Sequence, residues 1–151
     1  MRVPKKNRLN TMRVLASAHP ALRGSLLLND IIHELNRIAA AERSDKTDSW
    51  LLKVLHTTRA LDTSLKEVLA HKGWTPTDKK TGKPKFGLGA YLIELQIHGV
   101  LTPRQRDNFQ KAIVDKRNRY MHQAGTMPNR LEANTILNEM DTCLSVIFTN
   151  T

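Results

Sequence analysis

The chain has a single cysteine, Cys143, among its 151 residues, which excludes an intramolecular disulfide and a zinc site built from several thiolates. Aromatic residues make up only 5% of the chain, which disfavours a surface that binds single-stranded bases by stacking alone. No apolar run approaches the length that a bilayer requires, so we expect no membrane association. We therefore expect a cytoplasmic protein whose one thiol is buried and structural.

No acidic residue precedes Asp30, whereas basic residues recur from the first positions onward. Over the whole chain 24 Lys and Arg face 14 Asp and Glu, a net charge of +10. Such an excess is typical of a protein whose partner is a polyanion, with nucleic acid as the first candidate. We interpret residues 1–24 as a basic N-terminal arm, either for phosphate contact or as a solvated terminus, and residues 25–151 as one domain.

Period-2 alternation of apolar and polar residues is missing, so no strands are expected. Apolar residues recur instead at helical spacing, which predicts an all-α fold: an up-and-down bundle of four to five helices. Thr102 followed by Pro103 is a strong helix start, and Gly73 and Gly125 mark helix ends. The expected helices cover a short stretch at 8–18 and the longer segments 25–43, 47–72, 88–98, 102–123 and 129–149.

The longest connection, 74–86, contains four lysines: Lys79, Lys80, Lys83 and Lys85. Loops often carry function, and a lysine cluster can hold the phosphates of an RNA strand. The alternative is a flexible connector with ordinary surface lysines.

The segment 116–122 places Arg117, Asn118 and His122 within about one and a half helical turns. Arginine is a permanent forked cation suited to phosphate, and histidine can take and give a proton near neutral pH. These three residues are the candidate catalytic set, and Lys116 and Arg119 are candidate RNA-binding residues. No metal ligands and no cofactor are expected.

Helical spacing puts Arg117 on the apolar face with Phe109 and Ile113. A charge on that face is energetically costly unless it is paired or serves a function. Arg117 then either pairs with an interior acid, with Glu94 as the first candidate, or points into a cleft formed with a second subunit. Arg117 and His122 are five positions apart, which is roughly 140° around the helix. Either the helix unwinds near its end or two copies meet across a two-fold axis, and we favour a homodimer.

The stretch Arg117-Asn118-Arg119-Tyr120-Met121-His122 resembles the signature of HEPN domains, an arginine followed after four to six residues by a histidine. The preceding segment, with Gly87-Leu88-Gly89 and the helix from Thr102, is similar too, so the resemblance covers about 86–125. It implies a helical bundle, commonly dimeric, that cleaves RNA without metal in toxin–antitoxin or phage-defence systems. The implied roles are catalysis by Arg117 and His122 with assistance from Asn118. A branch paired with an antitoxin has tyrosine two residues after the histidine, where this chain has Ala124.

The predicted function is therefore a metal-independent endoribonuclease, a toxin or phage-defence effector, that uses the ribose 2′-hydroxyl as the nucleophile. An antitoxin or regulatory protein is a further expected partner. The alternative is a non-catalytic helical module that binds nucleic acid or regulates transcription, because the region also resembles regulators of the mannitol-operon repressor type. A third possibility is a protein-interaction adaptor in which Arg117 is a buried ion-pair partner.

Overall fold

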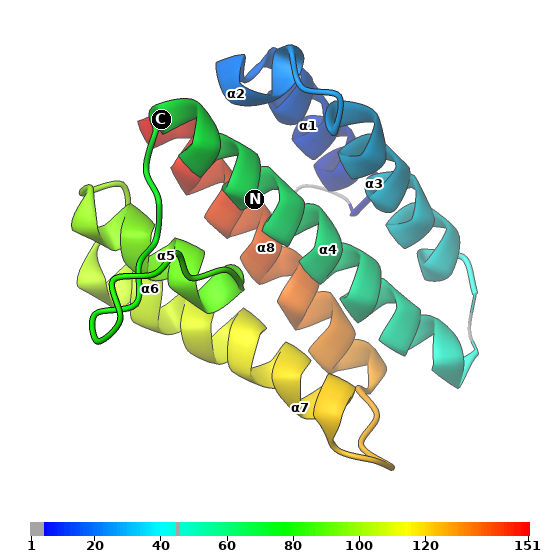
Figure 1. The fold of residues 1–151 in the computed structure, drawn as a ribbon. Coiled ribbons are helices and arrows are strands. Elements are labelled where there is room, and N and C mark those ends of the chain that lie inside the picture. Colours follow the sequence, from blue (N-terminus) through cyan, green and yellow to red (C-terminus); the bar gives the residue numbers. More distant parts are fainter. Residues whose placement is uncertain (1–4, 45) are drawn as a thin grey trace.

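The computed structural model describes residues 5–44 and 46–151, and over these residues the chain is helical apart from its connections (Figure 1). The predicted all-α bundle is therefore confirmed. The elements are α1 (Lys5–Ala18), α2 (Pro20–Arg23), α3 (Leu28–Glu42), α4 (Thr47–Lys72), α5 (Leu88–Ile97), α6 (Pro103–Phe109), the π-helix η1 (Gln110–Asp115), α7 (Lys116–His122) and α8 (Arg130–Asn150).

Helix α4 is the longest helix described and lies at the centre of the bundle (Figure 1). It packs against α3 and α8, and its other flank meets α5 and α7. The core is formed by the apolar stripes that the sequence predicts on these helices. Fully buried members of those stripes include Ile31, Leu35, Ile38, Val54, Leu61, Leu65, Val68, Leu92, Ile136, Met140, Leu144 and Ile147.

The segment interpreted as a basic arm is helical from Lys5 onward, and residues 1–4 with Arg2 lie outside the described residues. Leu9, Met12 and Ala16 of α1 are each no more than 2% exposed and belong to the same core as α3 and α8. Their spacing puts one apolar stripe on α1, and Arg8 and Arg13 lie outside that stripe and are partly exposed. This segment is thus packed on the bundle rather than extended away from it.

The helix that carries the candidate motif begins as predicted. The Thr102 hydroxyl accepts a hydrogen bond from the Gln105 N–H at 3.1 Å, and the Gln105 side chain accepts one from the Thr102 N–H at 2.9 Å. This reciprocal pair is a capping box, and Pro103 supplies the preferred φ at the first position. The start of the α6–η1–α7 rod is therefore fixed by local sequence.

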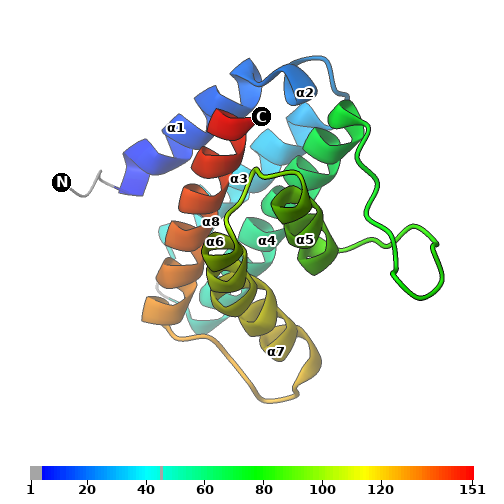
Figure 2. The same ribbon diagram turned by 90° about the vertical axis from the view of Figure 1, so that its left-hand side faces the viewer.

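The connection between α4 and α5 is an ordered hairpin, which Figure 2 shows projecting from the bundle. The Asp78 N–H donates to the Lys83 carbonyl at 2.9 Å, and the Lys85 N–H donates to the Pro76 carbonyl at 2.8 Å. The Asp78 carboxylate accepts hydrogen bonds from the N–H groups of Lys80 and Thr81, and these bonds lower the pKa of Asp78. The four predicted lysines are exposed on this folded hairpin.

Candidate functional site

The candidate motif lies on α7, immediately after the π-helical segment η1 (Gln110–Asp115). The wider π-helical turn, with i→i+5 hydrogen bonds, turns the chain less per residue than an α-helix does. The prediction that Arg117 shares the buried face was wrong, because its side chain is exposed. Buried positions on this rod are Phe109, Ile113, Val114 and Tyr120.

Helix α5 approaches η1 closely at Gly89. A Cβ built on Gly89 would lie 3.1 Å from the Gln110 side-chain oxygen, which is tighter than most Cβ contacts. The Gln110 amide donates to the Asp115 carboxylate at 2.8 Å, five residues along the same helix. Gly89 and this side-chain pair therefore lie together beside the turn that precedes the motif.

Arg117 is held by its neighbour in sequence: its Nη1 donates to the Asn118 side-chain oxygen at 2.9 Å. The predicted Glu94 partner is also wrong, because the Glu94 carboxylate lies 3.1 Å from the His98 imidazole. Asn118 thus orients the guanidinium of Arg117 on an exposed surface.

On one side of Arg117 is a hollow of about 260 Å³ whose other walls come mainly from α4. Its polar lining includes Arg59 and Asp62, with Leu88 of α5 at the edge. Burial raises the pKa of the Asp62 carboxyl, and the positive charges of Arg117 and Lys66 counteract part of that rise. Asp62 is therefore the carboxylate that Arg117 faces.

On the other side of Arg117 is a second hollow, of about 430 Å³, between α5 and the α6–η1–α7 rod. Its lining includes Lys85, Arg106 and Asn118, together with the exposed ring of Phe86. Lys85 is the predicted hairpin lysine that reaches this surface. Arg117 lines both hollows, so a polyanion crossing this face would pass over its guanidinium.

His122 is exposed at the last position of α7, and among the described lining residues it belongs to neither hollow. The end of α7 is fastened to α8 by the buried Tyr120, whose hydroxyl donates to the Glu132 carboxylate. That bond lowers the pKa of Glu132, and the charges of Lys116 and Arg119 lower it further. Lys116 and Arg119 therefore lie near Glu132 as well as near solvent.

Sequence reasoning missed the α4 wall of this site. Arg59, Asp62, Thr63 and Lys66 recur at i, i+3, i+4 and i+7, so they form one polar stripe on α4. Such a stripe is normally a solvent-exposed face, and no local feature of the sequence distinguishes the wall of a site from an ordinary exposed face. Behind it lies the buried Glu34 carboxylate, which is 2.6 Å from the His56 imidazole and 3.0 Å from the Arg59 guanidinium.

Over 5–44 and 46–151, no group of three or more His, Cys, Asp or Glu side chains is placed to hold a metal ion. Within the same residues, the helices are all too short or too polar to cross a bilayer. No family model, curated protein or solved structure matches the chain. The resemblance to HEPN domains accordingly rests on the motif residues themselves.

Proposed function

We propose that this chain is a metal-independent endoribonuclease of the HEPN type. The observation that carries the proposal is the exposed Arg117–Asn118 pair between two hollows with basic walls, with an exposed histidine at the end of the same helix. A guanidinium in this setting binds phosphate, and the imidazole supplies proton transfer. The substrate class is RNA, because the reaction requires the 2′-hydroxyl.

The proposed reaction is an internal transesterification. His122 takes the proton of the ribose 2′-hydroxyl, and O2′ bonds to the adjacent phosphorus while the bond from phosphorus to O5′ breaks. Arg117 stabilises the added negative charge on the phosphoryl oxygens, with Asn118 as its positioning residue. A second histidine or water protonates O5′, so the products are a 2′,3′-cyclic phosphate and a 5′-hydroxyl.

One copy of α7 does not direct both groups to one phosphate. Five α-helical residues correspond to roughly 7.5 Å of rise and 140° of rotation. We therefore propose a homodimer in which the α7 helices of two copies face one another, so that Arg117 of one copy meets His122 of the other. A toxin or phage-defence role, with an antitoxin or regulatory partner in the cytoplasm, belongs to the same proposal.

The test is cleavage of end-labelled RNA by the purified protein in the presence of chelator. We expect His122→Ala to lower the rate by ~10²–10⁴-fold and Arg117→Ala by ~10²–10³-fold. Exposed residues of the same types, His71 and Arg104, provide matched alanine controls that keep full activity. RNA with a single 2′-deoxy nucleotide at the cleavage position should resist. Inhibition by chelator, or full activity of His122→Ala, would refute the nuclease.

A second candidate is a nucleic-acid-binding or transcription-regulatory module without catalysis. It is favoured by the position of His122 outside both hollows that Arg117 lines. The same experiment distinguishes the two, because this module retains labelled RNA in a mobility shift and leaves it uncut. Its affinity should fall steeply with added salt as phosphate counterions are released.

A further inference from the structure

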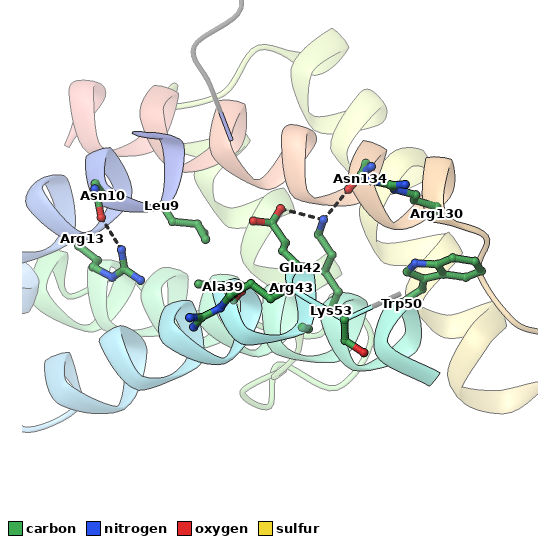
Figure 3. A pocket seen from close by; sticks show the side chains of 12 residues that line it. Leu9, Asn10, Arg13, Ala39, Glu42, Arg43, Trp50, Lys53, Arg130 and Asn134 are labelled. Atoms are coloured by element: carbon green, nitrogen blue, oxygen red, sulfur yellow. Dashed lines mark hydrogen bonds and ion pairs between the residues drawn. The ribbon is translucent and has the colours of Figure 1, made fainter. Parts of the chain in front are cut away.

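The largest cavity described lies away from Arg117, among α1, the end of α3, the start of α4 and the start of α8 (Figure 3). Its volume is about 530 Å³, within the usual range for small-molecule sites. None of its lining residues lines either hollow beside Arg117. Whatever occupies it is therefore independent of the proposed ribonuclease site.

The floor of this cavity is a buried polar chain. Lys53 is 4% exposed, and its ammonium lies 2.9 Å from a Glu42 carboxylate oxygen and also donates to the Asn134 side chain. The carboxylate neutralises the ammonium, so these two groups add no net charge. The remaining Glu42 oxygen faces a cavity that a hydroxyl or N–H donor of a ligand can enter.

The walls of the cavity carry three arginines, Arg13, Arg43 and Arg130, so its excess charge is positive. Arg13 is already oriented, because its Nε donates to Asn36 at 3.1 Å and its Nη1 donates to Asn10 at 2.6 Å. Guanidinium has five N–H donors, and those beyond these two bonds suit phosphate oxygens. A preoriented guanidinium loses little conformational entropy when an anion binds.

The charged and aromatic groups are segregated along the cavity. Figure 3 shows Arg13 and Arg43 toward one end and Trp50 with Arg130 toward the other, with Lys53 between them. An indole is a stacking platform for any base, and a nearby guanidinium can stack or bind as well. The arrangement matches a ligand with phosphate at one end and a planar base at the other.

We propose that this cavity is a nucleoside-phosphate site, in which Arg13 and Arg43 bind the phosphates and Trp50 stacks on the base. The ligand is either a free nucleotide or the 5′-phosphorylated end of an oligonucleotide, which share this chemistry. Glu42 accepts from the ribose hydroxyls between the two ends. The site adds a nucleotide-responsive function to the chain and does not depend on RNA cleavage.

The test uses Trp50 fluorescence in a Trp74→Phe background, because the chain has two tryptophans. Titration with ADP should change this signal and saturate below about 1 mM, while adenosine and pyrophosphate each bind at least about tenfold more weakly. Arg43→Gln should weaken ADP binding about tenfold or more and leave adenosine binding unchanged. Arg104→Gln, on an exposed face of α6, is the matched control with unchanged affinity.

Two further arms identify the source of the ligand and guard against misfolding. A 2′-O-methyl pentanucleotide with a 5′-phosphate resists the proposed cleavage and therefore serves as the strand-end probe. If this pentanucleotide binds more tightly than ADP, the natural ligand is a strand end, and if it binds more weakly, the natural ligand is a free nucleotide. Arg130→Gln, checked by circular dichroism and read by the same Trp50 signal, reports on the base end if Arg43→Gln unfolds. The proposal is overturned if ADP gives no saturable signal, if pyrophosphate binds as well as ADP, or if Arg43→Gln binds ADP like the parent protein.

Discussion

The buried pair of Lys53 and Glu42 allows a stability prediction worked from burial. Their side chains are 5% and 16% exposed, and the ammonium and carboxylate are 2.9 Å apart. Lys53→Met keeps most of the packing volume but leaves the Glu42 carboxylate without its cation. Removing one member of a buried pair costs ~3–5 kcal/mol, and because Glu42 borders a cavity that water can enter, we expect about 2–3 kcal/mol.

The double variant Lys53→Met/Glu42→Leu buries no charge, so we expect it to lie within about 1 kcal/mol of the parent protein. Denaturant unfolding of the parent, both single variants and the double variant gives the coupling free energy between the two positions. Each single variant leaves one buried charge unpaired at a cost of about 2–3 kcal/mol and the double variant leaves none, so we expect a coupling of about 3–5 kcal/mol. The pair Arg106–Asp107, whose side chains are 29% and 56% exposed, is the control and should couple by no more than ~1 kcal/mol. A Lys53–Glu42 coupling as small as that of the control would contradict the reasoning.

Three other predictions test the packing around the candidate site. The Tyr120 hydroxyl lowers the pKa of Glu132, so their bond stabilises the fold above the ordinary pKa of about 4.5, and this stability is lost as pH falls through the lowered pKa. Tyr120→Phe should therefore reduce the loss of unfolding free energy at acidic pH in unfolding scans. An unchanged pH dependence in this variant would argue against the bond. Burial raises the pKa of Cys143, so a thiol reagent should label it at the rate of unfolding, and fast labelling of the native protein would contradict its burial. Gly87 has φ 119°, so Gly87→Ala should destabilise by about 1–3 kcal/mol, whereas Gly24→Ala, at φ −101°, should be neutral in the same melts.

Much of the helical architecture was predictable, because the signals for it are local. The start at Pro103 follows from a capping box, and the end of α4 follows from Gly73, whose φ of 70° suits glycine. The core residues of α3, α4 and α8 were predictable for the same reason, because in a regular helix the apolar residues that recur every 3.6 positions lie on the buried face.

The placement of Arg117 was not predictable by that route. Counting residues assumes 3.6 per turn throughout, and the π-helical segment η1 breaks this assumption. The carboxylates near Arg117 and Arg59, which are Asp62 and Glu34, also come from other helices, and single-sequence spacing contains no information on which helices adjoin. The packing of α1 was obscured by its charge, although Leu9, Met12 and Ala16 already mark a stripe.

The π-helical turn has a consequence for how this chain tolerates change in length. Because α6, η1 and α7 form one uninterrupted rod, the number of residues upstream sets the azimuth of every position beyond Asp115, that is, its direction around the rod axis. A π turn takes up about one residue more than an α-helix does over the same rotation, so excising one residue within Gln110–Asp115 would restore a regular α-helix and leave Arg117 near its present azimuth. Excising one residue from α6 would instead swing the guanidinium by about 100°. The π turn is therefore the one described part of the rod that can lose a residue without moving the groups on the surface of α7.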